Sequence, residues 1–233
     1  MTKNSSRRIM MLLLLILATS HYSSVLAQST EKILFDGKTL KGWHGFNQKG
    51  EVKNWTVSHG ALVCLGAAQD AHGGDLVSDG VYENFELSWE WKVDKGSNSG
   101  VMYHVVESDK YEAPYETGPE YQIIDDIGFP AKLEEWQMAG ADYAMTPANG
   151  QKKLKPVGEW NSSKIIYNKG HVEHWLNGVR IVEFEAYTPE WKHKRETGKW
   201  KDYPGYGTST QGHIALQDHG NKAYYRNMRI KAL

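Results

Sequence analysis

Short runs of alternating apolar and polar residues dominate the chain from Ile33 onward. Gly, Asn and Asp separate these runs, and no long segment shows helical periodicity. Alternation of this kind is typical of strands that bury one face, and Asn177-Gly178 between two runs is a hairpin signal. The pattern predicts an all-β fold, an antiparallel sandwich or jelly roll. The clearest runs are residues 55–57, 61–65, 85–93, 101–106, 120–124, 164–168, 171–176, 179–184, 213–217 and 223–230.

Residues 188–211 interrupt this pattern. The segment is rich in Lys, Gly, Trp and Tyr and has no periodicity. A connection of that length is too long to be idle inside a compact domain, so we expect a lid or a binding loop. Residues 133–138 are long enough for one or two helical turns.

The N-terminus has the organisation of a secretory signal. Lys3, Arg7 and Arg8 precede an apolar run over residues 9–18, and Val25-Leu26-Ala27 has the small-x-small pattern of a cleavage site. A membrane span needs about 20 apolar residues, and this run supplies roughly half of them. We therefore expect a cleaved signal peptide at residues 1–27, one domain at residues 28–233, no membrane span, and a periplasmic or secreted bacterial protein.

Charge and cysteine content narrow the class further. The 233 residues carry 27 Lys and Arg against 28 Asp and Glu, and removal of residues 1–27 takes away three bases and no acids, so the net charge becomes 24 − 28 = −4. A nucleic-acid partner requires a basic surface and is not expected. The single cysteine, Cys64, excludes an intrachain disulfide, and we expect it to be a buried apolar residue.

Strand geometry places several hydrogen-bonding side chains on shared faces, because residues i and i+2 of a strand point the same way. In the run at 120–124, Glu120 and Gln122 share a face opposite Tyr121 and Ile123. In the run that follows Asn98, the same alternation groups Asn98 with His104 and predicts that His104 points away from the core.

A third run adds two histidines. Ile214 and Leu216 are expected in the core, which leaves His213, Gln217 and His219 together on the other face. By the same alternation, His171 and His174 cannot both face one site.

Together these three runs predict a polar floor that suits sugars. Imidazole and carboxylate groups transfer protons near neutral pH, amides bind hydroxyl groups, and aromatic rings stack on pyranose rings. The chain has nine Trp and 13 Tyr. It has no His-Glu-x-x-His zinc motif and no Gly-x-Ser-x-Gly nucleophile elbow.

A set of ordered motifs resembles the 3-keto-disaccharide hydrolase domain family of the concanavalin A-like lectin and glucanase superfamily. The resemblance covers almost all of residues 31–233 and implies a two-sheet jelly roll with a carbohydrate groove on its concave sheet. The motifs are Leu34 to Trp43, Trp55-x-Val57 with Gly60-x-Leu62, Asn98 to Val101, Glu120 to Asp125, Glu159 to Asn161, Leu176 to Gly178, Gly212 to Gly220 and Tyr225 to Asn227.

The resemblance implies action on oligosaccharides or glycosides that carry a ketone at sugar carbon 3. The ketone acidifies the C2 proton, so a base can remove it while the C1 substituent departs, and water can then add to the enone. We expect His104 or His219 to take the C2 proton, and the other histidine or Glu120 to protonate the leaving oxygen.

The remaining candidates have supporting roles in this hypothesis. Gln122, Gln217 and Asn98 would bind sugar hydroxyls. Arg226 or His213 would stabilise the enolate oxygen, or else a divalent metal ion held by His104, Glu120 and His219 would do so.

Two other classes of function remain open. A glycan-binding module without turnover would use the same aromatic and amide groups, although it has little use for several titratable groups on one floor. A conventional glucanase would need a second carboxylate near Glu120, and Asp125 is out of phase for that role. A polysaccharide lyase would need a Tyr and His pair beside Arg residues that bind uronate.

Overall fold

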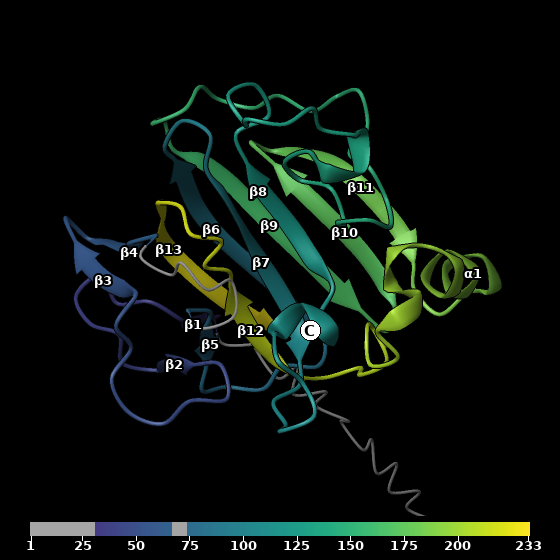
Figure 1. Cartoon of the computed structure of the whole chain (residues 1–233), viewed down its shortest axis with the longest axis horizontal. Helices are drawn as coiled ribbons and strands as arrows, with labels where there is room; N and C mark the ends of the chain where they lie inside the picture. The colour runs from purple at the N-terminus through teal and green to yellow at the C-terminus, as the bar shows by residue number, and fades with distance from the viewer. Residues whose placement is uncertain (1–30, 67–73) are drawn as a thin grey trace, which may run out of the picture.

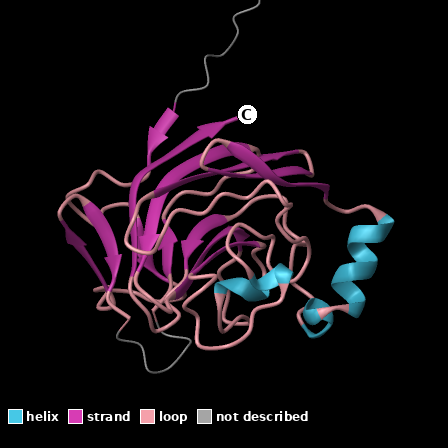
Figure 2. Ribbon diagram, turned by 90° about the horizontal axis from the view of Figure 1, so that it is seen from above, coloured by secondary structure: helices cyan, strands magenta, loops and turns pink. Residues whose placement is uncertain are grey.

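The computed structural model describes residues 31–66 and 74–233, so the expected signal peptide at residues 1–27 lies outside the described residues. Two antiparallel sheets pack face to face and enclose the core (Figures 1 and 2). The predicted two-sheet antiparallel jelly-roll sandwich is therefore confirmed. Within the described ranges, no helix has the length and apolar character that crossing a membrane requires.

The larger sheet has eight strands. Its order is β11-β10-β9-β6-β13-β4-β3, and β1 also pairs with β13. The bounds of these strands are β1 Glu31–Ile33, β3 Trp55–Ser58, β4 Ala61–Cys64, β6 Phe85–Val93, β9 Asn161–Asn168, β10 His171–Leu176, β11 Val179–Glu185 and β13 Ala223–Ala232.

The smaller sheet has five strands in the order β2-β5-β12-β7-β8. Its inner face packs on the larger sheet, and its outer face carries the candidate site. The strands are β2 Trp43–Gly45, β5 Leu76–Ser78, β7 Asn98–Val105, β8 Glu120–Ile124 and β12 His213–Leu216.

The core forms because the long strands bury alternate residues. Along β6, Phe85, Leu87, Trp89, Trp91 and Val93 are buried, while the residues between them are half-buried on the outer face. Each buried aromatic ring removes a large apolar area from water, so these positions dominate the stability of the sandwich. Cys64 is fully buried and unpaired, as predicted.

The segment at 188–211 differs from its predicted irregular form. It contains a helix, α1 (Pro189–Thr197), followed by a 3₁₀ turn, η3 (Lys199–Asp202). Thr188 caps α1 by accepting a hydrogen bond from the backbone N–H of Trp191 at 3.2 Å, and proline at the first helical position favours the start. Only Trp191 is buried on this short helix, so no apolar periodicity announced it.

Other short elements complete the fold. The 3₁₀ turn η1 (Pro114–Glu116) follows β7, and η2 (Glu135–Gln137) lies within the predicted helical stretch. Strands β1, β2 and β5 have three residues each, which is too short for alternation to reveal them.

Candidate functional site

A polar pocket lies on the outer face of the five-stranded sheet. Its floor comes from β8, which carries Glu120 and Gln122, and from Asn98 at the start of β7. Gln217 and His219, which follow β12, line the same pocket. The structure thus brings together five of the predicted site residues from three distant parts of the chain.

Aromatic and basic side chains from the loops cover this floor. Tyr143 lies across from Glu120, because its backbone N–H donates to the Glu120 carbonyl at 3.0 Å. The predicted binding loop contributes through η3 and the residues after it, so it does line the pocket. The covering residues are Tyr115, Tyr143, Lys199, Trp200 and Tyr203, and they leave a cavity of about 240 Å³. Such a size, below the usual range for drug-sized ligands, suits about one sugar ring.

Glu120 is the most unusual group in the pocket. Its side chain is buried, and within residues 31–66 and 74–233 its carboxyl group forms no hydrogen bond or ion pair. Burial raises the pKa of Glu120 to about 8, an effect that nearby Lys199 opposes and nearby Asp75 reinforces. Glu120 is therefore largely protonated at neutral pH and can act as a proton donor.

Asp75 is a second carboxyl group in this pocket, and sequence reasoning missed it. It precedes β5, and it is buried with one oxygen accepting the backbone N–H of Asp218 at 2.8 Å. Burial raises the pKa of Asp75 to about 7. A three-residue strand gave no alternation from which to place Asp75, so the sequence held no signal for it.

The three amide side chains differ in what they can offer a ligand. Gln122 is held by the protein: its Nε2 donates to the carbonyl of Gln137 at 3.1 Å, and its Oε1 accepts the backbone N–H of Ile123 at 3.1 Å. In the described parts of the chain, the side-chain oxygen of Asn98 is buried without a partner, and the amide of Gln217 is also unpaired. Asn98 and Gln217 are thus the amides best placed to meet sugar hydroxyls.

Two basic groups face the pocket from its rim. His219 is exposed beside the floor. Lys199 donates from Nζ to the hydroxyl of Tyr143 at 2.9 Å and lies 4.1 Å from the centre of that ring. Lys199 therefore brings a positive charge to the pocket, a role that the sequence analysis gave to Arg226 or His213.

The prediction that His104 points away from the core is wrong. His104 is 1% exposed, its Nε2 donates to the carbonyl of Glu83 at 2.8 Å, and its ring packs 4.3 Å from that of Tyr167. Burial lowers the pKa of His104 to about 4. The histidine is therefore a neutral packing residue, outside the pocket.

A β-bulge explains this error. Val105 pairs with His213 and Met102 pairs with Ala215, so Tyr103 and His104 together oppose a single residue of β12. The backbone of His104 is left-handed, with φ of 53°, and the alternation shifts by one position there. Gly100 on β7 and Gly212, which packs against the backbone of His104, lie nearby, but neither is one of the bulged residues.

His213 also lies outside the pocket. It begins β12, four residues before Gln217, which corresponds to about 13 Å along a strand. Its Nδ1 donates to the carbonyl of Ser78 at 2.7 Å, and its Nε2 lies 3.9 Å from Glu107. An apolar patch that includes Met102 and Ala215 separates His213 from the polar floor.

Arg226 lies on the outer face of the other sheet. Its Nε donates to Glu90 at 2.5 Å, and its guanidinium stacks over the ring of Trp160 at 4.0 Å. The neighbouring Tyr225 points into the core, so strand alternation directs Arg226 outward. The prediction that Arg226 contacts substrate in the predicted groove is therefore wrong.

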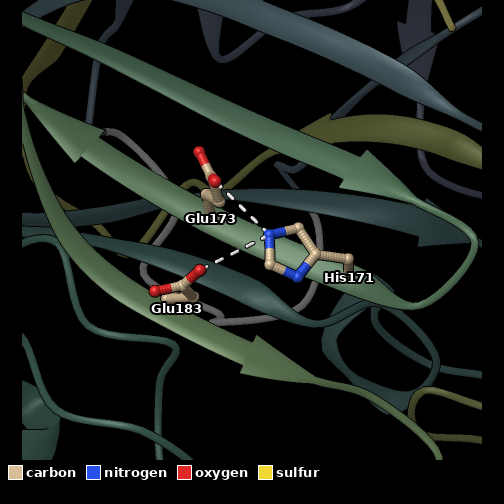
Figure 3. Close-up of side chains that lie close together, drawn as sticks. All are labelled: His171, Glu173 and Glu183. Atoms are coloured by element: carbon tan, nitrogen blue, oxygen red, sulfur yellow. Dashed lines mark hydrogen bonds and ion pairs between the residues drawn. The ribbon is translucent and has the colours of Figure 1, made fainter.

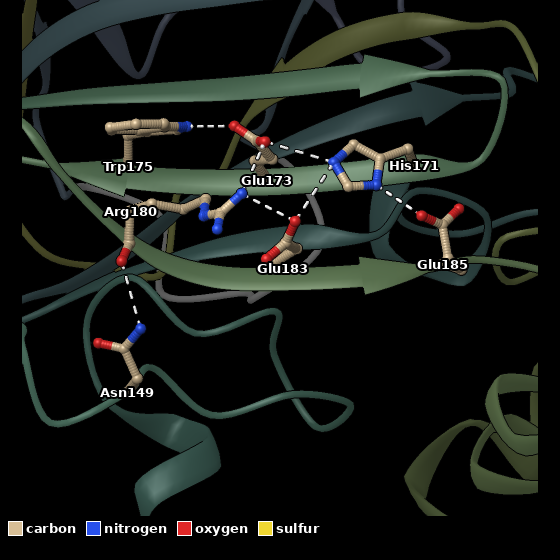
Figure 4. Close-up of polar contacts among 7 residues, drawn as sticks. All are labelled: Asn149, His171, Glu173, Trp175, Arg180, Glu183 and Glu185. Atoms are coloured by element: carbon tan, nitrogen blue, oxygen red, sulfur yellow. Dashed lines mark hydrogen bonds and ion pairs between the residues drawn. The ribbon is translucent and has the colours of Figure 1, made fainter.

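A second cluster of titratable groups lies on the outer face of the eight-stranded sheet. His171 and Glu173 of β10 lie beside Glu183 and Glu185 of β11, and Arg180 joins them (Figure 4). His171 bonds to Glu185 at 2.6 Å, and Arg180 donates to Glu173 at 3.1 Å and to Glu183 at 2.7 Å. We name this set the β10–β11 cluster.

One histidine and two carboxylates of the β10–β11 cluster are close enough to share a metal ion. The ligand atoms of His171, Glu173 and Glu183 lie within 4.8 Å of one another (Figure 3). Arg180 already bridges the two carboxylates, so the cluster has its own cation. His174, in contrast, is buried and donates to the Gly140 carbonyl at 3.0 Å, which confirms that His171 and His174 face different sides.

The metal-ligand set expected from the sequence does not assemble. His104 lies in the core, whereas Glu120 and His219 line the pocket. No three-residue set can form from groups on opposite sides of the five-stranded sheet.

Comparison with known proteins identifies relatives over most of the chain. A sequence profile described as a 3-keto-alpha-glucoside-1,2-lyase-like domain matches residues 30–231. A curated protein of Bacteroides thetaiotaomicron named 3-keto-disaccharide hydrolase is 36% identical over 225 residues, which cover 86% of this chain and 77% of that protein.

Solved structures agree. A crystal structure of a candidate glycosyl hydrolase from Parabacteroides distasonis is 44% identical with a TM-score of 0.81, covering 87% of this chain and 94% of its own. Another candidate glycosyl hydrolase from that species is 28% identical with a TM-score of 0.66, covering 88% of this chain and all of its own.

Proposed function

This chain belongs to the family of 3-keto-alpha-glucoside-1,2-lyase-like domains, and we propose that it cleaves glycosides whose sugar is oxidised to a ketone at carbon 3. A role in carbohydrate metabolism follows from the family and from its glycosyl hydrolase-like relatives. The proposal adds the mechanism: removal of the C2 proton, elimination of the C1 substituent, and addition of water to the enone. One observation carries the mechanism, namely the buried carboxyl group of Glu120 on the floor of a pocket of sugar-ring size, where no described residue bonds to it and burial raises its pKa to about 8.

Glu120 is the proposed acid. Departure of the C1 substituent leaves negative charge on the glycosidic oxygen, and a carboxyl group that keeps its proton at neutral pH can supply the compensating proton. Burial provides that property here, because the pKa of Glu120 is raised to about 8. Because no described residue bonds to this buried carboxyl group, it is also free to donate to a ligand.

His219 is the proposed base. Histidine is the side chain best suited to accept a proton near neutral pH, and among the described residues His219 is the histidine that lines this pocket. The C2 proton is acidified by the adjacent ketone, so a modest base is sufficient. Once the C1 oxygen has left with the proton from Glu120, water adds at C1 and gives a proton to the Glu120 carboxylate, while His219 returns its proton to C2, so both groups are restored and the net reaction is hydrolysis.

Lys199 is the proposed partner of the enolate oxygen. Removal of the C2 proton places negative charge on the oxygen at C3, and a fixed positive charge at the pocket rim stabilises it. Asn98 and Gln217 would bind the remaining hydroxyls, while Gln122 shapes the floor through its internal hydrogen bonds. Tyr143 and Tyr203 offer rings for stacking on the sugar, whereas the buried ring of Trp200 stacks on Tyr206 beneath them.

One observation favours a conventional glycosidase as the alternative function. Asp75 places a second carboxyl group beside Glu120 in the lining of the pocket. That mechanism needs one ionised carboxylate beside one acid. Burial raises the pKa of both groups, Asp75 to about 7 and Glu120 to about 8, so at neutral pH only about half of Asp75 carries the negative charge that this mechanism needs.

The substrate test compares a 3-keto-glucoside with its unoxidised parent, each incubated with the purified protein. Release of the aglycone from the keto compound alone supports the proposal. Release from the parent supports the conventional glycosidase, and binding of both without release supports a glycan-binding module.

We also propose that the protein is exported from the cytoplasm. The basic start, apolar run and Val25-Leu26-Ala27 site support export, so the substrate would be met in the periplasm or outside the cell. Immunoblots of cell fractions, with the size of the mature chain, test this assignment.

A further inference from the structure

The carboxyl group of Glu120 lies flat on the floor of the pocket, over Gly100. Glu120 pairs with Met102 across β7 and β8, and Gly100 pairs with Gln122. The side chain of Glu120 thus leans along the sheet, toward the neighbouring pair, instead of rising into the pocket. On the other side of β7, the carbonyl of Gly100 accepts the backbone N–H of Gln217 at 3.0 Å.

Space, and not backbone conformation, explains the glycine at position 100. Gly100 is absent from the residues with positive φ, so any residue could adopt its backbone angles. A Cβ atom at this position would instead collide with Oε1 of Glu120, and it would lie 2.7 Å from Cδ and 2.9 Å from Cγ. The missing side chain therefore forms a notch that the carboxyl group of Glu120 fills.

We propose that Gly100 is a positioning residue for Glu120, and that its notch holds the carboxyl group in the dry, low orientation from which it donates to the leaving oxygen. The proposal rests on the proposed function insofar as Glu120 is the acid. The notch also explains how a carboxyl group stays buried at the bottom of a polar pocket: it is pressed against the backbone of β7, which lies between β8 and β12.

The substitution Gly100→Ala tests this directly. The colliding atoms belong to the end of a flexible side chain, and the backbone is unstrained, so the variant should fold with Glu120 turned up into the pocket. An upright carboxyl group meets more water, which lowers its pKa toward the ordinary value.

The primary readout is the titration of Glu120 itself. Carbon-13 labelling of glutamate, with Glu120→Gln to assign the signal, gives the pKa by NMR without any need for turnover. We expect the titration midpoint in Gly100→Ala to fall by at least about one pH unit. An unchanged midpoint would overturn the proposal.

Gly80→Ala is the matched control. Gly80 also lacks a positive φ, and a Cβ there would meet the end of one flexible side chain, that of Tyr82, with Cζ at 2.8 Å. Gly80 lies outside the pocket, so this control should leave both the Glu120 titration and turnover unchanged. A shift in both variants would show a general effect of lost glycine and would also contradict the proposal.

Turnover provides the second readout. We expect Gly100→Ala to lower kcat about ten- to hundredfold and to move the alkaline limb of the pH profile to lower pH. In a Glu120→Gln background, Gly100→Ala should cost nothing further, because its effect passes through the carboxyl group. An additive loss would contradict the proposal. If the wild type turns over no keto-glycoside while the titration midpoint still falls, the proposed function fails and the notch stands.

Discussion

Two polar clusters on opposite faces of the sandwich show what distinguishes a reactive site from a structural network. In the β10–β11 cluster, the charged groups pair with one another on the outer face of the eight-stranded sheet. In the pocket, the described contacts leave the carboxyl group of Glu120 and the side-chain oxygen of Asn98 without partners. Both clusters are titratable, yet only one holds unsatisfied groups.

The direction of the pKa shifts follows from this difference. In the β10–β11 cluster, hydrogen bonding to Glu185 raises the pKa of His171, and the pKa of Glu173 is lowered by its hydrogen bonds to Trp175, His171 and Arg180, which outweigh burial. Each shift stabilises the charged form. In the pocket, burial raises the pKa values of Glu120 and Asp75, which stabilises the neutral form. In these two clusters, extensive pairing stabilises the charged forms, whereas burial in the pocket stabilises the neutral forms.

The largest expected effect is on turnover, which should depend on the pocket and not on the β10–β11 cluster. Glu120→Gln should lower turnover of a 3-keto-glucoside at least about a hundredfold, because it removes the acidic proton and preserves shape. Glu183→Gln, the same change in the β10–β11 cluster, should alter turnover less than about twofold. Initial rates at saturating substrate check both. Equal losses of turnover in the two variants would contradict the assignment of the pocket as the reactive site.

The substitution Glu120→Gln, which lowers turnover, should raise the free energy of unfolding at high pH. The pKa of Glu120 is about 8 in the folded protein against an ordinary 4.5, so its contribution to stability is fully present below pH 4.5 and is lost as pH rises through about 8. Glu120→Gln removes this pH-dependent loss of stability, because glutamine does not ionise. Chemical denaturation at pH 5 and pH 8.5 should show the variant gaining on the order of 1–3 kcal/mol over the wild type at the higher pH. A destabilised variant at pH 8.5 would mean that Glu120 is paired and structural.

The pH profile of turnover should reflect Lys199. Activity of the wild type should decline above about pH 8 as Glu120 loses its proton. Because Lys199 lowers the pKa of Glu120, Lys199→Met should move this limb to higher pH by less than about one unit, and it should also reduce the maximum rate. Profiles of kcat between pH 5 and pH 10 measure this shift. A limb that moves to lower pH would remove Lys199 from the electrostatics of Glu120.

The smallest effect is expected in the β10–β11 cluster. Its carboxylates raise the pKa of His171, so the stabilisation is fully present below the unfolded pKa of about 6.5 and is lost as pH rises through the raised folded value. The group is solvent-accessible, so His171→Ala should cost no more than about 0.5 kcal/mol at pH 6 and less at pH 9. Denaturation curves at the two pH values check this. A cost that grows with pH would contradict the pairing.

Strand alternation was sufficient to predict the sandwich and part of the site. The runs at Phe85–Val93, Glu120–Ile124 and His171–Leu176 are strands with the predicted bounds. In β8 the alternation also placed Glu120 and Gln122 on the pocket face. Such reasoning succeeds where a strand is long and regular, because side chains then alternate between the two faces without interruption.

The wrong predictions concern residues whose positions do not follow from the alternation of a single regular strand. The bulge at His104 shifted the alternation and turned the histidine into the core. On β12, His213 shares the correct face but lies too far along the strand. Arg226 was assigned through a family motif without regard to which sheet holds β13. Asp75 and Lys199 come from short or irregular segments, whose side chains are placed only by tertiary packing.

The fate of the hydrogen at carbon 2 tests the central claim most directly. Cleavage of a 3-keto-glucoside in D₂O should remove this hydrogen, so that NMR of the fresh product shows either deuterium at C2 or the enone, while the same free sugar without protein exchanges more slowly. Glu120→Gln should still exchange the C2 hydrogen of uncleaved substrate, and His219→Ala should not. Release of a sugar that keeps its original hydrogen at C2 would contradict the account.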